Sequence, residues 1–266
     1  MKNKDIKESV NRPKVSIITV VKNDVANIKS TIDSVITQTY SNIEYIIIDG
    51  DSVDGTKEII FEYKDYVNII VSEPDEGLYY AINKGIRICS GDWIGILNSG
   101  DVYNDKHTIE TVFLNNKNDV DVIYGDSIEI SENKERIVRS GDIKKMEYSP
   151  VYRHGSSFVR AEVQRKYEYN TRNKRIGYAL DWDMIYKLFK DGGVFCYIDI
   201  IIEKYRKEGI SNRPLMNAWY NYLVTVAYNN KIKKTFFFVY NIFGILGRIL
   251  IDMVHILFDW LLFAEE

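Results

Sequence analysis

Residues 14–21 read KVSIITVV, an almost unbroken run of apolar side chains. Such a run is typical of a parallel strand that is covered on both faces, since a half-exposed strand alternates apolar with polar residues. Similar runs follow at residues 43–49 (IEYIIID), 67–72 (VNIIVS), 92–98 (DWIGILN) and 120–126 (VDVIYGD). We therefore predict five buried strands in the first half of the chain.

Helical patterns separate these strands. Apolar residues between positions 25 and 35 return every three or four residues, which places them on one face of a helix. They are Val25, Ile28, Ile32 and Val35. Further helices are predicted at residues 56–63, 78–89 and 107–116. Strands that alternate with helices predict an α/β fold, with a parallel sheet and helices on both of its faces.

The pattern loosens after Asp126. We expect a hairpin around SENKE at residues 131–135, a loop at 140–155, and a strand with a short helix within 156–167. A basic loop at 171–178 follows, then a helix that begins at Asp181 and stops at two glycines, and a strand at 194–202.

The C-terminal part has a different character. An aromatic helix is predicted at residues 212–229, followed by lysines 231, 233 and 234 and by a long apolar helix at 235–263. One stripe of that helix is polar, and its members are Asn241, Gly244, Arg248, Asp252, His255 and Asp259. Charges facing a bilayer centre are costly, so such a helix lies in the membrane interface or packs against a partner. The expected domains are a disordered lead-in at 1–13, the α/β domain at 14–210 and a helical extension at 211–266.

Composition excludes several classes of protein. The chain has 266 residues, of which 45% are hydrophobic and 27% charged, so it can build a sizeable core. Its net charge of −3 supplies no basic field for nucleic acid. Cys89 and Cys196 stand in apolar surroundings and are expected to be buried, reduced thiols. The N-terminus lacks an apolar signal-peptide core, and we expect a cytoplasmic location.

Polar clusters follow the predicted strands where each one ends. They lie at residues 23–24, 49–54, 73–75 and 98–101. Ligands of parallel α/β sheets bind beyond the carboxyl ends of the strands, so these clusters predict a nucleotide site. No GxGxxG follows the first strand and no GxxxxGK[ST] occurs, which argues against dehydrogenases and P-loop enzymes.

Each candidate residue also has a structural interpretation. Asp49 can contact a nucleotide or can stabilise its own turn, whereas Asp54 is expected to cap a helix. Asp101, with Asn98 nearby, suits a divalent cation but also suits a simple turn. Lys84 can reach phosphate oxygens or can remain solvated on its helix.

Two later segments raise the same choice. His154 lies between arginines 153 and 160, where it can serve a structural hydrogen bond or contact an acceptor. Asp181 and Asp183 open a helix, where capping and the helix dipole alone would explain two aspartates.

Five segments together resemble the motifs of inverting family 2 glycosyltransferases with the GT-A fold. In order they are KVSIITVVKN, IEYIIIDGDSVDGT, SEPDEGLYYAINKG, IGILNSGD and ALDWDMIYKL, within residues 14–205. The resemblance is closest to the bacterial branch that builds O-antigen, capsule and other surface glycans. It implies a Rossmann-like GT-A domain with a mostly parallel sheet, to which a membrane-associating or oligomerising helical extension is added.

The resemblance also assigns roles. Asp101 would bind Mn2+ or Mg2+, and Asp181 would be the catalytic base. His154, Trp182 and Asp183 would contact the acceptor. The nucleotide part of a sugar-nucleotide donor, with UDP expected, would be bound by Thr19, Val21, Asn23, Asp49, Asp75, Asn83, Lys84, Asn98, Ser99 and Gly100.

The expected reaction is transfer of one sugar, with inversion, to a hydroxyl of a free or lipid-linked glycan. The enzyme would lie on the inner face of the plasma membrane, held there by the C-terminal helix, unless that helix forms a homodimer.

Two other functions remain open. A sugar-phosphate nucleotidyltransferase would normally carry a glycine-rich basic loop after the first strand, where this chain has TVVKNDVA. A non-catalytic membrane-associated module would not need Asp101 or Asp181.

Overall fold

The computed structural model describes residues 12–114, 119–131, 134–207, 213–228 and 231–263, with side chains described as far as Arg248. The chain packs as two compact units, and each is described here by itself. The first comprises Met1–Ser140, Tyr152–Glu168 and Val194–Arg206, and the second comprises Gly141–Val151, Tyr169–Gly193 and Lys207–Glu266. The predicted domain boundaries near residues 13 and 210 stay a prediction; residues 1–11 and 208–212 lie outside the described residues.

The described strands of the first unit form one nine-stranded sheet in the order β3-β2-β1-β4-β8-β6-β9-β5, with β7 beside β6. Its N-terminal part consists of β1 (Val15–Val21), β2 (Ile43–Asp49), β3 (Ile69–Ser72) and β4 (Trp93–Ile96). These four strands are parallel, as the apolar runs predict.

The rest of the sheet is mixed, which corrects the expectation of a parallel sheet. It consists of β5 (Val102–Tyr103), β6 (Val122–Ser131), β7 (Lys134–Val138), β8 (Ser157–Arg160) and β9 (Phe195–Arg206). Of these, β9 runs parallel to β6, whereas β5, β7 and β8 run antiparallel to their neighbours. Two successive strands can pair in parallel only if a long crossover, usually a helix, connects them. The short connection between β6 and β7 allows only an antiparallel pair. The hairpin turn at SENKE includes residues 132–133, which lie outside the described residues.

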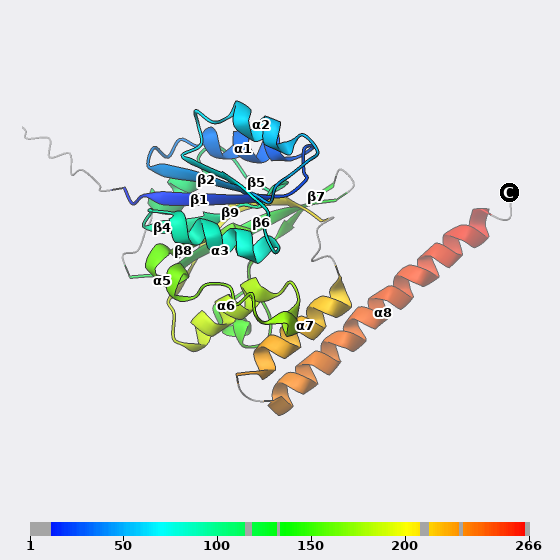
Figure 1. The fold of residues 1–266 in the computed structure, drawn as a ribbon. Helices are drawn as coiled ribbons and strands as arrows, with labels where there is room; N and C mark the ends of the chain where they lie inside the picture. The colour runs from blue at the N-terminus through cyan, green and yellow to red at the C-terminus, as the bar shows by residue number, and fades with distance from the viewer. Residues whose placement is uncertain (1–11, 115–118, 132–133, 208–212, 229–230, 264–266) are drawn as a thin grey trace, which may run out of the picture. The chain divides into compact units, whose positions relative to one another are not determined.

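Helices cover both faces of the N-terminal strands (Figure 1). One face carries α1 (Ile28–Ile36) and α2 (Thr56–Glu62), and α4 (Thr108–Leu114) packs into the same apolar cluster. The other face carries α3 (Leu78–Ile88), with α5 (Ala161–Lys166) beside it. The helix predicted at 107–116 agrees with α4 as far as it is described, since residues 115–116 lie outside the described residues.

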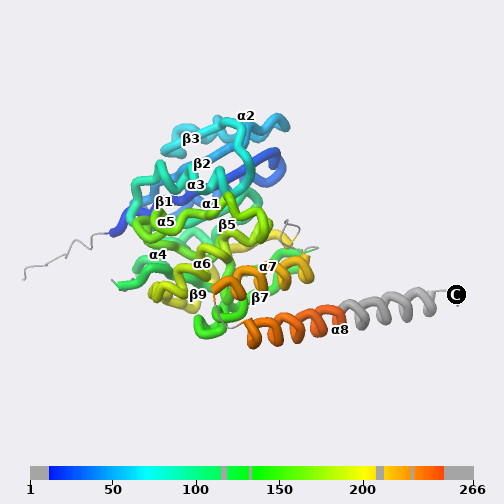
Figure 2. The backbone as a smooth tube through the Cα atoms, turned by 60° about the horizontal axis from the view of Figure 1, so that its bottom comes forward, coloured from blue at the N-terminus to red at the C-terminus, as the bar shows by residue number. Residues whose placement is uncertain are grey.

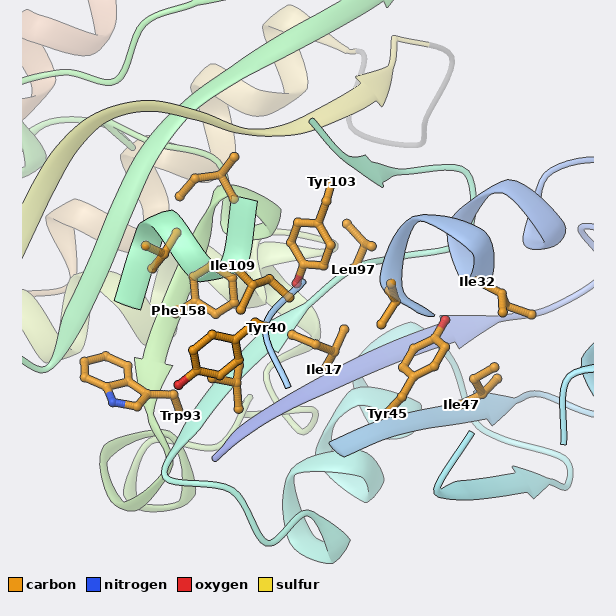
Figure 3. Packing of buried hydrophobic residues seen from close by; sticks show 14 of the residues in the cluster. Ile17, Ile32, Tyr40, Tyr45, Ile47, Trp93, Leu97, Tyr103, Ile109 and Phe158 are labelled. Atoms are coloured by element: carbon orange, nitrogen blue, oxygen red, sulfur yellow. The ribbon is translucent and has the colours of Figure 1, made fainter. Parts of the chain in front are cut away.

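The main core includes buried residues of α1, α2 and α4 together with residues of the sheet. Figure 3 shows part of it. Ile17 and Ile47 reach it from β1 and β2, Trp93 from β4 and Phe158 from β8. At most 1% of the surface of each residue is exposed to solvent. Ile17 and Ile47 share one face of the sheet with every second residue of their strands, because alternate residues of a strand point to the same face. This core fixes the strand ends on which the polar loops stand.

Close packing on the opposite face depends on Gly85 of α3. A Cβ atom there would lie 2.5 Å from Cγ2 of Ile18, so only glycine lets the helix approach β1 this closely. The distance also explains why a residue with poor helix propensity stands in the middle of a helix.

The start of α1 differs from the sequence prediction. The helix begins at Ile28, and Val25 precedes it with 40% of its surface exposed. The backbone N–H of Val25 donates to Asp54 Oδ2 at 3.1 Å, and Asp24 O accepts from the N–H groups of Asn27 and Ile28. These bonds hold a turn where the apolar spacing predicts helix.

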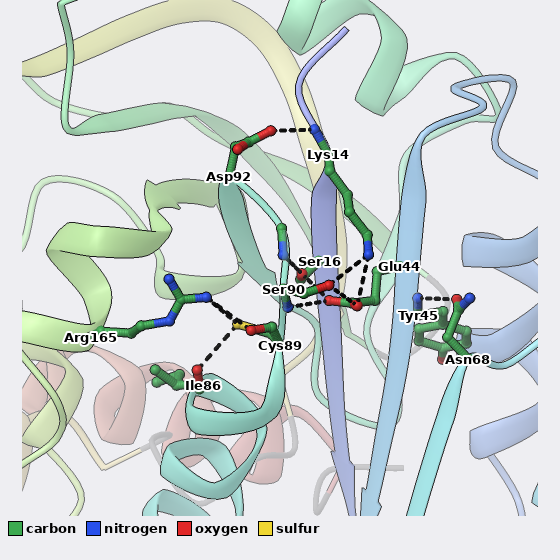
Figure 4. Close-up of polar contacts among 11 residues, drawn as sticks. Lys14, Ser16, Glu44, Tyr45, Asn68, Ile86, Cys89, Ser90, Asp92 and Arg165 are labelled. Atoms are coloured by element: carbon green, nitrogen blue, oxygen red, sulfur yellow. Dashed lines mark hydrogen bonds and ion pairs between the residues drawn. The ribbon is translucent and has the colours of Figure 1, made fainter.

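A polar cluster closes the amino-terminal ends of β1, β2 and β4 (Figure 4). Glu44 is almost fully buried, and its carboxylate accepts from Ser16 Oγ at 2.5 Å, from Ser90 N at 2.7 Å and from Lys14 Nζ at 2.9 Å. Burial raises the pKa of Glu44, but the hydrogen bonds from Ser16, Ser90 and Lys14 outweigh it and lower the pKa to about 2.

Both cysteines are free thiols; Cys89 is buried as expected, whereas Cys196 is half-buried.

The second unit is mainly helical. It contains α6 (Leu180–Lys190), α7 (Pro214–Val226) and α8 (Lys231–Phe263), and α7 and α8 pack side by side (Figure 2). Short 3-10 turns at Ile143–Glu147 and Lys174–Ile176 interrupt the predicted loops. Residues 212 and 229 of the predicted aromatic helix lie outside the described residues. Among the helices of the described part, none combines the length and apolar character needed to cross a bilayer.

Helix α8 begins at Lys231, four residues before the predicted start, so the basic segment forms its first turn, and that turn is not solvated as a whole. Lys231 and Lys233 are exposed, but Lys234 is buried, and its Nζ donates to Tyr186 Oη at 2.6 Å and to Thr225 O at 2.7 Å. Glu147 Oε1 lies 3.3 Å from the same ammonium, which compensates its burial. Of the predicted polar stripe, Asn241, Gly244 and Arg248 are described, whereas the side chains of Asp252, His255 and Asp259 are not.

Candidate active site

The parallel register brings the predicted polar loops to one edge of the sheet. Val21 pairs with Asp49, and Asp49 pairs with Ser72, so three strands end at the same level. The segment after β4 joins them, because Ser99 N donates to Val20 O at 3.1 Å. Ligand sites of such sheets lie at this edge.

Asp49 organises the loop that follows β2. Its side chain has 0% exposure and accepts from Ser52 N at 3.1 Å, from Ser52 Oγ at 2.5 Å and from Ser72 Oγ at 2.6 Å. The carboxylate therefore has the partners that the turn interpretation predicts. Its contact with a nucleotide stays a prediction.

Asn23 joins the loops after β1 and β2. Its φ of 52° lies in the left-handed region, which asparagine tolerates better than most residues. In this conformation its N–H donates to Ser52 Oγ at 2.8 Å, and its Oδ1 accepts from Val53 N at 2.9 Å. Asp54 accepts from Thr56 N at 3.1 Å in the first turn of α2, as the capping expectation states.

The loop after β4 is a tight turn. Gly100 has a φ of +92°, and its N–H donates to Thr31 Oγ1 at 3.0 Å, while that hydroxyl donates to Asp101 O at 2.9 Å. Asp101 N closes the turn on Asn98 O at 3.0 Å, and Ser99 Oγ donates to Asp24 Oδ2 at 2.6 Å. Helix α1 and the loop after β1 therefore hold the backbone of this loop.

Asn98 and Asp101 place an amide oxygen and a carboxylate in the same turn. Asn98 Oδ1 is buried and accepts no hydrogen bond within the described part of the chain. Burial and the negative charge of Glu203 raise the pKa of Asp101 to about 8, although Arg153 and the backbone N–H of Arg206 lower it. A divalent cation prefers such carboxylate and amide oxygens and keeps water or phosphate oxygens beside them.

Sequence reasoning missed two residues next to Asp101. Glu203 has 0% exposure and lies on β9, one residue beyond the end of the predicted strand. Arg153 donates from Nε to Glu203 Oε1 at 2.8 Å. The three residues come from distant parts of the sequence, so no local pattern indicates that they meet.

Four predicted nucleotide-binding residues have other immediate surroundings. Thr19 is fully buried, with its hydroxyl 3.1 Å from Tyr45 Oη, and the Val21 side chain packs in the core. Asn83 is buried on α3, and Lys84 Nζ lies 2.5 Å from Glu73 Oε1. Of these four side chains, only that of Lys84 is half-exposed and within reach of a ligand.

Two further predicted residues stand at segment starts. Asp75 Oδ1 accepts from Gly77 N at 2.8 Å, immediately before α3. His154 begins a short 3-10 turn in the first unit, and its carbonyl accepts from Ser157 Oγ at 2.7 Å.

The predicted base and two acceptor residues belong to the second unit. Asp181 and Asp183 lie in the first turn of α6, and both are partly exposed. Burial raises the pKa of Asp183, while Lys187 lowers it. Trp182 is buried, its ring centroid 5.1 Å from that of Tyr186, so its side chain packs in the unit rather than facing solvent.

Among the described residues, no three histidine, cysteine, aspartate or glutamate side chains form a metal-binding cluster. A metal at Asp101 would therefore need further ligands from the substrate or from water, which is how Mg2+ is commonly held.

Comparisons with known proteins agree on one family. The model of "Glycosyl transferase family 2" matches residues 16–195. A PGL/p-HBAD biosynthesis glycosyltransferase of Mycobacterium bovis is 27% identical over 208 residues, covering 75% of this chain and 80% of that protein. An uncharacterized glycosyltransferase of Rickettsia prowazekii is 26% identical over 210 residues, covering 74% and 65%.

Solved structures share the fold. S. aureus TarS, residues 1–349 with UDP-GlcNAc, superposes with a TM-score of 0.64 at 16% identity, over 83% of this chain and 69% of that one. A mannosyltransferase of Pyrobaculum calidifontis with GDP-Man and Mn2+ has a TM-score of 0.64 at 15% identity, over 83% and 66%. At this identity the likeness concerns the fold, which agrees with the GT-A expectation.

Proposed function

Because the chain belongs to glycosyl transferase family 2, we propose that it moves one sugar, with inversion, from a nucleoside-diphosphate sugar to a hydroxyl of a glycan acceptor. A UDP-sugar is the expected donor. The observation that carries the proposal is the loop of Asn98 and Asp101 at the carboxyl edge of the sheet, beside the loops of Asn23 and Asp49. A solved structure of the same fold contains UDP-GlcNAc.

Asn98 and Asp101 fit the metal that the family implies. The unpartnered, buried Oδ1 of Asn98 and the Asp101 carboxylate, whose ionisation a nearby cation would favour, are the donor set that Mn2+ or Mg2+ prefers. A cation held there would stabilise negative charge on the departing diphosphate. The solved mannosyltransferase that shares the fold contains Mn2+.

Asp181 is the proposed base. Asp181 lies in the first turn of α6, and its carboxylate can accept the proton that the acceptor hydroxyl loses as it attacks. Asp183 lies two residues further along α6 and therefore points to a different side of the helix. We assign Asp183, Trp182 and His154 to the surroundings of the acceptor.

We further propose that the acceptor is lipid-linked and belongs to bacterial surface polysaccharide biosynthesis, on the cytoplasmic side of the membrane. A similar protein is named for PGL/p-HBAD biosynthesis. In the second unit, α8 exposes apolar side chains at spacings of four and three, and they are Ile232, Phe236, Val239, Phe243 and Leu246. The exposed Lys231 and Lys233 would add attraction to anionic lipid.

Flotation with liposomes tests the membrane part. Truncation after Asn230 removes α8 and should abolish flotation with anionic vesicles, whereas the full chain should float. If both proteins behave alike, α8 serves another purpose, and a change from dimer to monomer on truncation would identify that purpose as homodimerisation.

A panel of UDP-, GDP- and dTDP-sugars tests the reaction. We expect one donor to raise the melting temperature in the presence of Mn2+ and to be slowly hydrolysed without acceptor. A chain that binds none of the panel, with or without metal, would contradict the proposal.

A further inference from the structure

The Arg153 side chain is fixed in place by a hydrogen bond to Glu203 and by stacking on Tyr205. Its Nε donates to Glu203 Oε1 at 2.8 Å, and its guanidinium carbon lies 3.4 Å from the centroid of the Tyr205 ring. Ser156 N and Ser156 Oγ both donate to the Arg153 carbonyl, at 3.1 and 2.9 Å, which fixes its backbone. Only Nε of the guanidinium donates a hydrogen bond within the described part of the chain, so Nη1 and Nη2 keep their donors.

Glu203 serves as a rigid anchor for this arginine. It is fully buried, and Ser127 Oγ donates to the same Oε1 at 3.1 Å. A Cβ atom on Gly155 would collide with Oε2, so the backbone after Arg153 closes over the carboxylate. The Arg153 side chain remains 34% exposed, so a ligand can reach its free nitrogen atoms.

The strand register places Arg153 beside Asp101. The antiparallel pair β5–β9 sets Tyr103 opposite Glu203 and Val102 opposite Lys204. Continuing this register by one residue sets Asp101 opposite Tyr205. Side chains two residues apart on a strand share a face, so Asp101 lies on the face of Tyr103, and Tyr205 on the face of Glu203. Asp101 therefore shares its face with the two residues that hold Arg153. Burial lowers the pKa of Arg153, but the negative charges of Glu203 and then of Asp101 raise it by more.

We infer that Arg153 binds the diphosphate of the donor through Nη1 and Nη2 and stabilises the nucleoside diphosphate as it leaves, with Glu203 as its positioning residue. The inference rests on the function proposed above. In the reaction, the acceptor oxygen forms a bond to the anomeric carbon, and the bond from that carbon to the diphosphate oxygen breaks. The electron pair stays on the diphosphate and the acceptor proton passes to the base, so the leaving group gains one negative charge beside a planar cation.

A simpler role for Arg153 is charge compensation of Glu203 alone. Arg139 provides a matched control for that role, because it pairs with Asp126, another fully buried carboxylate of the same sheet. Arg139 uses Nη1 for both Asp126 and Asp199, and neither bond involves the loop of Asp101.

The experiment compares Arg153→Met, Arg153→Lys and Arg139→Met with the wild-type full chain. Calorimetry with Mn2+ measures the affinity for UDP and for UMP, and thermal melts measure stability. Arg153→Met should weaken UDP binding by about 10- to 100-fold, the range of one to two charge-assisted hydrogen bonds, and should weaken UMP binding less. Arg153→Lys should recover part of the loss. Arg139→Met should lower the melting temperature while keeping both affinities.

A second variant, Glu203→Gln, tests the positioning role. It should weaken UDP binding more than UMP binding while the far-ultraviolet circular dichroism stays unchanged. The inference would be overturned if Arg153→Met bound UDP with wild-type affinity. It would also be overturned if Arg153→Met and Arg139→Met each lost as much affinity for UMP as for UDP. Either result would leave the proposed function intact. A wild-type chain that binds none of UDP, GDP and dTDP would overturn both.

Discussion

Replacing Glu44 by glutamine should remove a stabilising charge that acts only above acidic pH. The buried carboxylate accepts hydrogen bonds from Ser16, Ser90 and Lys14, which lower its pKa from 4.5 to about 2. A pKa difference of this size corresponds to about 3 kcal/mol of folding free energy at neutral pH. The Glu44 side chain is only 7% exposed, so screening by solvent reduces this free energy little.

The sign of the pH dependence follows from the direction of the shift. A carboxyl group whose folded pKa lies below its unfolded value stabilises the fold above the unfolded pKa, and this contribution is lost as the pH falls through the folded pKa. The Glu44→Gln variant should therefore be about 3 kcal/mol less stable than wild type at pH 7. The difference should shrink between pH 4.5 and pH 2, where wild-type Glu44 becomes protonated.

Urea unfolding followed by circular dichroism at several pH values between 7 and 3 measures this difference. Glu62→Gln serves as the control, because Glu62 is an exposed carboxylate on α2. The control should match wild type throughout the series. A difference for Glu44→Gln that stays constant, or that grows as the pH falls, would refute the role assigned to the polar cluster.

Other variants test the remaining parts of the account. Asp101→Asn should keep the fold but lose the Mn2+-dependent part of the thermal stabilisation by UDP. Asp181→Asn should still bind the donor while kcat falls by about 10²–10⁴-fold, and Asp183→Asn should lose less, as steady-state kinetics would show; near-normal turnover of the first with a dead second would reverse the assignment. Gly85→Ala should destabilise the chain by about 1–3 kcal/mol in urea titrations, because its Cβ would crowd β1. Gly244→Ala, whose added Cβ would meet no other side chain and no backbone outside its own helix within 4 Å, should not be destabilising.

The N-terminal half of the fold could be predicted because its signals are local. Continuous apolar runs mark β1 and β2, and the spacing of Ile28, Ile32 and Val35 marks α1. Once the strands are parallel, their polar ends must meet at one edge, which is why the loops of Asn23, Asp49 and Asp101 lie together. Only Val25 departs, because hydrogen bonds to the loop after β2 hold it in a turn.

The rest depends on tertiary contacts that no short segment reveals. Strand β5 has two residues, too few to show a period, and β8 pairs antiparallel with strands far away in sequence. Arg153 and Glu203 are 50 positions apart, and only the pairing of β5 with β9 places them near Asp101. Lys234 follows two exposed lysines, yet Glu147 makes its burial possible.

The stereochemistry of sugar release tests the central claim most directly. With the donor that the panel identifies and no acceptor, proton NMR in the first minutes of hydrolysis reports the anomeric configuration of the free sugar before it equilibrates. Direct displacement with a carboxylate base predicts a sugar whose configuration is opposite to that of the donor, formed in wild type and lost in Asp181→Asn. Release with retained configuration would contradict the account.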